Sequence, residues 1–427
     1  MRILMVLTEF PPRIGGMQTH AINLVEHLVK RGMDLEVVTY RAGDADETAA
    51  IESIDAAVPC PVHRCLSRIG YFHNLAVIER LGQRFKPDLI YTSTVFYGDL
   101  GARLKVPVVA RSVGNDVMRP WIVYPYRFCS RFVSHPLWEH RLYRFFKRID
   151  YPELIEAAFR RRRVRLMTKS ARKYDMIFAN SDFTASLLNG LGIRQRHRRV
   201  VTGGVDNDRF RLIKANPRGR DNWQIPTERF LLVTVCRLVK KKGLDFLIES
   251  MPQLMQTLPQ LHLLIVGDGR QAKRLQKQAL SSAASEHITF TGRIPHPEIE
   301  QAYACADAFV LASRLHHDRV TGIRDAETMG RVLCEANAVG LPVLAARSGG
   351  IPSVIEHEAN GLLFEPDNLA SLTTQLSRLV EDPMLRMKLI EEGRRRAKDR
   401  FDWSHIVAEH ELTFRQYAEG YRGTDGV

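Results

Sequence analysis

No apolar run in this 427-residue sequence approaches the roughly 18 residues that a membrane-spanning helix needs. The opening segment MRILMVL is short and runs into Thr8 and Glu9, so it predicts a strand and not a signal peptide. The sequence also lacks short-period repeats, low-complexity tracts and C-x-x-C spacings. Its six cysteines are Cys60, Cys65, Cys129, Cys236, Cys305 and Cys334. They indicate neither a disulfide framework nor a zinc site, and they fit a reducing compartment such as the cytoplasm.

Acidic residues are too few to balance the basic ones: 48 Asp and Glu face 62 Lys and Arg, which gives a net charge of +14. Much of the excess lies in residues 119–173, which hold 15 basic, 4 acidic and 11 aromatic side chains. Basic and aromatic residues together are typical of a surface that meets lipid headgroups or nucleic acid. We expect this segment to bind an anionic membrane surface, and nucleic-acid binding is the rival hypothesis.

Within this segment, apolar residues recur at helical spacing from Trp138 to Ile149, and basic residues fill the intervening positions. The basic run RRRRVR at 160–165 follows nearby. A helix of this kind could lie in the headgroup plane of a bilayer. The same apolar stripe could also pack on a sheet, with the arginines as its solvated face, so both hypotheses stay open.

Strand-like runs alternate with segments of helical periodicity, and the pattern restarts near residue 215. This alternation predicts two α/β domains, each a Rossmann-like, doubly wound parallel sheet, facing each other across a cleft. We place the first domain at residues 1–205 and the second at 215–403, joined by a linker rich in Gly, Pro, Asn and Asp. The runs are RILMVL, DLEVVTY, DLIYTS, VPVVAR, DMIFANS and RRVVTGG, then FLLVTVCR, LHLLIVG, HITFTG, AFVLAS, LPVLAA and NGLLFE.

Four charged residues of the second domain are candidates for ligand binding. Arg237 ends a strand-like run and Lys242 follows within KKKG, and cations at the carboxyl edge of a sheet can neutralise a diphosphate. Glu327 and Glu335 stand eight residues apart, one before a helix and one inside it. Carboxylates accept hydrogen bonds from vicinal hydroxyls, so this pair suits two polyols held along one ligand. The alternative for Arg237 and Lys242 is a basic turn without a ligand. The alternative for Glu327 and Glu335 is two solvated acids on a helix face.

The segment RDAETMGRVLCEANAVGLPVLAARSGGIPSVIEHEANGLLF resembles the donor-binding signature of family-four retaining glycosyltransferases, which have the GT-B fold. The resemblance continues in GGMQTH at 15–20, GGVDNDRF at 203–210, VCRLVKKKGLDFLI at 235–248, LLIVGDG at 263–269 and FTGRIP at 290–295. It covers the second domain and the ends of the first. The combination is specific, although each motif alone is weak.

The resemblance implies a role for each matching residue. Glu327 would hold the transferred sugar and Glu335 the ribose, while Arg237 and Lys242 would neutralise the departing diphosphate in place of a metal ion. Backbone of the glycine motifs would approach the phosphates or the sugar, and residues 404–420 would form a last helix on the first domain. The further binding residues are Gly15, Gly16, Gly292, Arg293, Ile294, Gly349 and Gly350.

The sequence departs from the family pattern in its first domain. In ARSVGNDV, Val113 stands where the family commonly has a histidine, and Arg111 and Asp116 are the remaining candidates there. Two short motifs suggest other chemistry. GDGRQA has the spacing of a dinucleotide fingerprint, but it follows the second strand of its domain and no strand-end acid follows it. Asp206-Asn207-Asp208 resembles a metal-binding D-x-D motif, and we expect two loop acids instead.

The resemblance therefore predicts a retaining, metal-independent glycosyltransferase that needs no cofactor. Its donor would be a UDP- or GDP-sugar, and its acceptor a lipid-linked or polysaccharide glycan, as in lipopolysaccharide or exopolysaccharide synthesis. We expect it to lie peripherally at the cytoplasmic face of the membrane, through residues 119–173, and to bind no nucleic acid. A protein that binds a nucleotide sugar without turnover, and a basic nucleic-acid-binding protein, are the alternatives.

Overall fold

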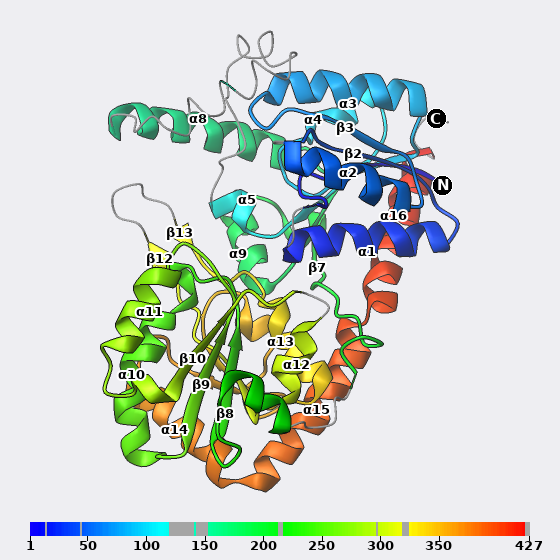
Figure 1. Ribbon diagram of the computed structural model, residues 1–427. Helices are drawn as coiled ribbons and strands as arrows, with labels where there is room; N and C mark the ends of the chain where they lie inside the picture. Colours follow the sequence, from blue (N-terminus) through cyan, green and yellow to red (C-terminus); the bar gives the residue numbers. More distant parts are fainter. Residues whose placement is uncertain are drawn as a thin grey trace. The chain divides into compact units, whose positions relative to one another are not determined.

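The computed structural model describes residues 1–12, 15–42, 45–118, 141, 153–211, 217–295, 298–317 and 324–422. The chain forms two units (Figure 1). One comprises Met1–Val201 with Ile406–Val427, and the other comprises Thr202–His405.

The first unit is built on a parallel sheet that, over the described residues, has seven strands in the order β3-β2-β1-β4-β5-β6-β7. The order reverses direction between β1 and β4, and right-handed crossovers then place helices on both faces. The strands are β1 Arg2–Val6, β2 Asp34–Tyr40, β3 Val62–Leu66, β4 Leu89–Thr92, β5 Val108–Ser112, β6 Met176–Ala179 and β7 Arg198–Val200. The helices are α1 Gly16–Lys30, α2 Ala45–Ala57, α3 Tyr71–Phe85, α4 Asp99–Leu104, α5 Asn115–Met118, α8 Glu153–Ala171 and α9 Asp182–Gly190.

The last helix, α16 (Trp403–Arg422), belongs to the first unit from Ile406 onward. Its Phe414 is fully buried and meets Tyr91 edge to face, with ring centroids 5.5 Å apart. His410, one turn earlier, lies 4.4 Å from the ring of Phe178. Burial lowers the pKa of His410 to about 3, so this ring packs as a neutral group.

The second unit repeats the design, and its described residues form a six-stranded parallel sheet in the order β10-β9-β8-β11-β14-β15. A separate antiparallel pair joins β12 to β13. The strands are β8 Phe230–Val235, β9 Leu261–Val266, β10 Ile288–Gly292, β11 Ala308–Leu311, β12 His316–His317, β13 Arg324–Asp325, β14 Val343–Ala346 and β15 Leu362–Phe364. The helices are α10 Leu244–Thr257, α11 Ala272–Leu280, α12 Ile299–Ala304, α13 Arg331–Val339, α14 Leu369–Glu381 and α15 Pro383–Phe401.

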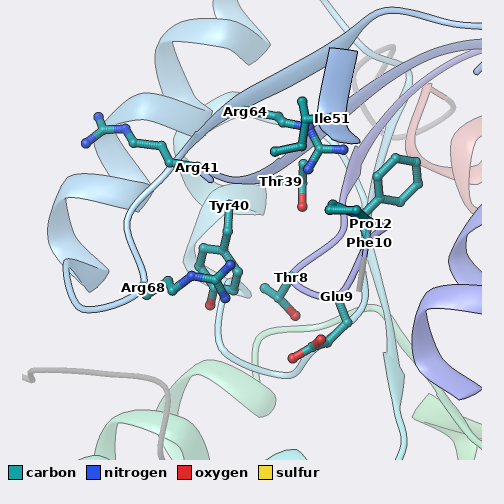
Figure 2. Close-up of a pocket in the computed structure, with 10 residues that line it drawn as sticks. All are labelled: Thr8, Glu9, Phe10, Pro12, Thr39, Tyr40, Arg41, Ile51, Arg64 and Arg68. Carbon is teal, nitrogen blue, oxygen red and sulfur yellow. The ribbon is translucent and has the colours of Figure 1, made fainter. Parts of the chain in front are cut away.

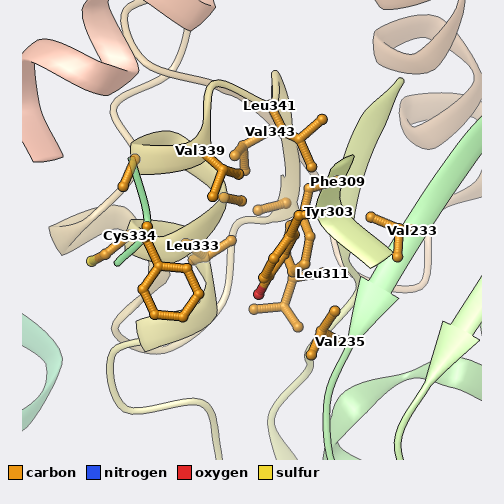
Figure 3. Close-up of a cluster of buried hydrophobic side chains, with 14 of the residues drawn as sticks. Val233, Val235, Tyr303, Phe309, Leu311, Leu333, Cys334, Val339, Leu341 and Val343 are labelled. Atoms are coloured by element: carbon orange, nitrogen blue, oxygen red, sulfur yellow. The ribbon is translucent and has the colours of Figure 1, made fainter. Parts of the chain in front are cut away.

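Both faces of this second sheet are covered, because successive strand residues enter two different clusters. Val233 joins a cluster with Leu333 of α13 and Ala397 of α15, which Figure 3 shows around Tyr303. Its neighbour Leu232 joins the opposite cluster, which α10, α11 and α14 complete. This explains why the strands read as continuous apolar runs without polar alternation.

The predicted fold class is confirmed: each unit is a doubly wound α/β domain on a parallel sheet. The boundaries differ from the prediction by a few residues. Residues 202–205, which the sequence assigns to the first domain, belong to the second unit. Val205 is fully buried there and its N–H donates to the Phe401 carbonyl at 2.7 Å. Phe210, in the expected linker, is also buried in the second unit's core.

Two strand regions lacked a sequence signal. β3, of sequence VHRCL, lies at the sheet edge and is only partly buried, so it does not form an apolar run. The pair β12–β13 is only two residues long on each side. The amphipathic helix expected over 138–149 lies outside the described residues, apart from Arg141. None of the helices that the structure describes is long and apolar enough to cross a membrane.

We predict that Phe414→Ala destabilises the first unit by about 3–5 kcal/mol, because it removes a fully buried ring from between α16 and the sheet. Leu412→Ala in the same helix is the control, since Leu412 is 59% exposed. Calorimetric unfolding would measure both variants. Equal stability of the two variants would show that α16 does not contribute to the first unit's core.

Candidate active site

Several candidate residues of the second unit lie near the reversal of strand order between β8 and β11: Arg237 and Lys242 follow β8, Glu327 follows β13, and Gly349 and Gly350 follow β14. Backbone hydrogen bonds join the segments that follow these strands. The Arg314 N–H, after β11, donates to the Lys241 carbonyl at 2.8 Å. The Gly350 N–H, after β14, donates to the Glu327 carbonyl, also at 2.8 Å. Ligands of doubly wound sheets bind at such an edge.

Lys242 and Glu327, two predicted site residues, form an ion pair. Their side chains are only 11% and 13% exposed. Burial alone would raise the pKa of Glu327, but the neighbouring cations Lys242 and Lys241 outweigh it and hold that pKa below its usual value. Burial would lower the pKa of Lys242, and Glu327 instead raises it. Both groups are therefore charged, and each depends on the other.

The preceding lysine, Lys241, was not predicted as a site residue. Its Nζ lies 3.0 Å from a carboxylate oxygen of Asp325 and donates to the Ala326 carbonyl at 2.9 Å. Successive lysines thus hold successive parts of the 325–327 segment. The sequence offered a run of three lysines without indicating which one meets which acid.

Gly349 is needed for the position of Glu327. Its φ is +54°, and a Cβ built on it would lie 2.1 Å from the Glu327 carbonyl oxygen. Any other residue would push the Glu327 backbone away. The Gly350 N–H donates to the same carbonyl. Gly349 and Gly350, both predicted binding residues, therefore position the backbone of Glu327.

Glu335 lies on α13 and is 6% exposed. Arg331 Nε is 3.3 Å from one of its oxygens, and the Tyr303 hydroxyl donates to the other at 3.1 Å. Burial raises the pKa of Glu335, although Arg331 opposes it. Neither partner was predicted. The spacing of four residues between Arg331 and Glu335 could have indicated the first, whereas no local signal joins Tyr303 on α12 to α13.

Arg237, at the end of β8, is exposed, and its side chain makes no hydrogen bond or ion pair with other residues that the structure describes. Its backbone is fixed by the glycines of GDGRQA. A Cβ on Gly267 would lie 2.0 Å from the Cys236 carbonyl oxygen, and one on Gly269 would lie 2.5 Å from that of Leu238. Close packing against 236–238 therefore accounts for these glycines without a dinucleotide.

The remaining predicted residues of the second unit are Gly292, which ends β10, and Arg293 and Ile294, which follow it. The Gly292 carbonyl accepts a hydrogen bond from the Gly267 N–H at 2.8 Å, which ties β10 to the loop that supports Arg237. Arg293 is exposed, and Ile294 packs against the hydrophobic core.

The D-x-D-like motif builds a turn. The Asp206 carboxylate accepts the Asp208 N–H at 3.1 Å and the Arg209 N–H at 3.0 Å. Across the described residues, no three His, Cys, Asp or Glu side chains are grouped so that they could hold a metal ion.

The predicted residues of the first unit lie in two segments, at the start of α1 and from β5 to α5. Gly15 and Gly16 lie at the start of α1, which has no side-chain cap. Arg111 Nη1 donates to the Val201 carbonyl at 2.8 Å, whereas Asp116 accepts from the Ser112 hydroxyl at 2.8 Å. Burial raises the pKa of Asp116 to about 6, against the hydrogen bonds that lower it. Both side chains are buried.

Two doubly wound domains define the GT-B fold, and solved structures match this chain along nearly its whole length. Anabaena Alr3699/HepE in complex with UDP is 20% identical, with a TM-score of 0.71 over 97% of this chain and 100% of that one. Sucrose-phosphate synthase from Thermosynechococcus elongatus is 19% identical, with a TM-score of 0.69 over 97% and 98%. At these identities the likeness shows the fold alone.

Two family profiles match the sequence itself. The profile described as Glycosyltransferase Family 4 matches residues 14–209, and the one described as Glycosyl transferases group 1 matches residues 216–396. The chain therefore belongs to the group 1 glycosyltransferases, as the sequence motifs predicted.

Two relatives with similar sequences are named as glycosyl-transferring enzymes. A GDP-mannose-dependent alpha-(1-6)-phosphatidylinositol monomannoside mannosyltransferase of Mycolicibacterium smegmatis is 35% identical over 47% of this chain and 51% of its own. The match thus spans about half the length of that relative. Sulfoquinovosyl transferase SQD2 of Arabidopsis thaliana is 28% identical over 91% of this chain and 68% of its own.

We predict that Lys242→Met and Glu327→Gln each destabilise the second unit by about 3–5 kcal/mol, because each leaves a buried partner charge unpaired. The double variant should lose less than the sum of the two, and calorimetric unfolding of all four proteins gives this coupling. Arg347 and Glu365, an exposed ion pair in the same unit, form the control cycle, with coupling of about 0.5 kcal/mol or less. Additive losses at Lys242 and Glu327 would contradict the ion pair.

Proposed function

We propose that this protein is a retaining, metal-independent hexosyltransferase that uses a nucleotide diphosphate sugar. The observation that carries the proposal is the buried Lys242–Glu327 pair beside the exposed Arg237, at the strand reversal of the second sheet. Two cations next to a carboxylate, Lys242 in the ion pair and Arg237 exposed beside it, suit a ligand that combines a diphosphate with sugar hydroxyls. Family membership supports the same assignment. Family membership also accounts for the sequence motifs of the second unit, which a nucleic-acid-binding protein would leave unexplained.

In this proposal Glu327 accepts hydrogen bonds from hydroxyls of the transferred sugar, and Glu335 accepts those of the ribose. The bond between the anomeric carbon and the donor phosphate oxygen breaks, and a bond from the same carbon to an acceptor hydroxyl oxygen forms on the same face. The acceptor proton passes to the departing phosphate, so a nucleoside diphosphate leaves. Arg237 and Lys242 stabilise the negative charge that develops on it.

The names of the relatives suggest the chemical class of the donor and of the acceptor. The mycobacterial relative is named for GDP-mannose and a phosphatidylinositol mannoside, and HepE is solved with UDP. We therefore propose a UDP- or GDP-sugar as donor and a lipid-linked glycan as acceptor, at the cytoplasmic face of the membrane. The exposed basic residues Arg161, Arg165 and Lys169 of α8 support contact with an anionic surface.

We predict that the purified protein transfers sugar from a panel of nucleotide sugars to membrane extracts in excess EDTA, with products identified by mass spectrometry. Arg237→Gln should lower kcat by about tenfold or more, because it removes a charge-assisted contact to the leaving group. Arg394→Gln, which removes an exposed cation from α15, is the control. Activity that disappears with EDTA and returns with Mg²⁺ or Mn²⁺ would refute metal independence. Binding of a nucleotide sugar without any product would instead identify a protein without turnover.

We predict that the protein sediments with anionic liposomes and less so as salt rises, because exposed charges are screened. Replacing Arg161 and Arg165 of α8 with Ser should weaken this binding. Replacing Lys398 and Arg400 of α15 with Ser removes the same charge from the second unit and serves as the control. Equal recovery with neutral and anionic liposomes would refute the membrane contact through α8.

A further inference from the structure

The turn that carries Lys242 joins β8 to α10, and the segment that follows β11 packs against it. The turn ends at Gly243, whose φ is +64°. A Cβ on Gly243 would lie 2.1 Å from the Ala312 carbonyl oxygen. Two residues after Ala312, the Arg314 N–H donates to the Lys241 carbonyl at 2.8 Å. The segment after β11 therefore touches the backbone on both sides of Lys242.

The Arg314 side chain adds a second tie to this part of the chain. Its Nη2 donates to both carboxylate oxygens of Asp245, at 2.7 and 2.6 Å, and Asp245 lies in the first turn of α10. Its Nη1 donates to Asp367, which follows β15, at 2.6 Å. Burial would lower the pKa of Arg314, but Asp367 and Asp245 outweigh burial and raise that pKa. The guanidinium is therefore charged and is held from two sides.

The ion pair with Glu327 does not by itself fix the Lys242 ammonium for a ligand. It places the ammonium relative to one carboxylate only. A lysine side chain is long and flexible, so the backbone of the turn decides where its ammonium group can lie. A shift of about 1 Å in a group that acts on the reacting atoms can lower a rate about a hundredfold. The contacts that hold this turn are therefore contacts on which turnover depends.

We propose that Arg314 is a positioning residue, which holds the turn after β8 so that the Lys242 ammonium stays where the donor diphosphate leaves. The inference rests on the proposed function, in which Lys242 stabilises the leaving group. Asp245 is the main partner, because both of its oxygens accept from Arg314 and it belongs to the helix that follows the turn. Asp367 is 46% exposed and lies after another strand, so its contact contributes less.

Kinetics of the full chain with the nucleotide sugar that supports transfer test this role. We expect Arg314→Gln and Asp245→Asn each to lower kcat by about tenfold or more, with a smaller loss in Asp367→Asn. The KM for the donor should change less than kcat, because Lys242 acts mainly on charge that develops as the diphosphate departs. Arg314→Lys keeps the charge without the planar fork, so its kcat should be intermediate.

Arg378→Gln is the matched control, since it removes an exposed ion pair from α14 in the same unit. Its kcat should equal that of the wild type. All variants are compared below the temperature at which the least stable of them begins to unfold. Wild-type kcat in Arg314→Gln, or an equal loss in Arg378→Gln, would overturn the proposal.

The pH profile distinguishes positioning from a general loss of folded protein. Burial lowers the pKa of Lys242 and raises that of Glu327, but their attraction outweighs burial in both cases. A displaced turn separates the two charges, which moves the first pKa down and the second up. The alkaline limit of activity should therefore fall and the acid limit rise in Arg314→Gln, while Arg378→Gln keeps the wild-type profile. A profile that loses height without becoming narrower would count against positioning.

A third measurement does not need activity. Calorimetric unfolding gives the coupling between Lys242 and Glu327 from the cycle of Lys242→Met and Glu327→Gln. In the Arg314→Gln background this coupling should fall by about half or more, and in the Arg378→Gln background it should not change. Unchanged coupling in both backgrounds would also overturn the proposal. Failure of the proposed function looks different: the wild type transfers no sugar from any donor, while the coupling still depends on Arg314.

Discussion

A buried ion pair between Lys242 and Glu327 is the interaction on which the second unit's site depends. Burying either charge alone would cost several kcal/mol, so each side chain holds the other in its ionised form. Its geometry is set by backbone packing. Gly349 lets the chain after β14 approach the Glu327 carbonyl, and Lys241 holds the neighbouring Asp325 and Ala326. The segments that follow β8, β13 and β14 thereby hold Lys242 and Glu327 in place.

The two units share one fold but carry different side chains at the carboxyl edge of the sheet. In each, a doubly wound sheet brings loop residues to a carboxyl edge beside the reversal of strand order. In the second unit the edge carries cations matched with carboxylates, which suits a ligand of phosphates and hydroxyls. In the first unit the edge carries arginines around a small pocket (Figure 2), where Arg64 is neutralised by Asp55 and Arg68 lies on Tyr40.

The glycine motifs mark positions where the structure requires glycine, but the reason for that requirement can be packing of the chain and not a bound ligand. Gly267 and Gly269 stand in a dinucleotide-like spacing, but their lack of side chains lets the loop touch Cys236 and Leu238. Gly349 likewise makes room for a carbonyl. A glycine motif in a sequence indicates close approach. Whether a ligand or the chain itself approaches is decided by what lies opposite.

The sequence by itself determined the parallel sheets, because strands buried on both faces must be continuously apolar, as β8 and β9 are. It also predicted Arg237, Lys242, Glu327 and Glu335 as site residues, since they stand in motifs near the end of a strand or in and before a helix. Only the tertiary structure decided which lysine meets which acid and that Tyr303 and Arg331 hold Glu335. It alone gathered the arginines of the first unit's pocket. These contacts join residues far apart in sequence, and local periodicity carries no information about them until the sheets bring their loops to one edge.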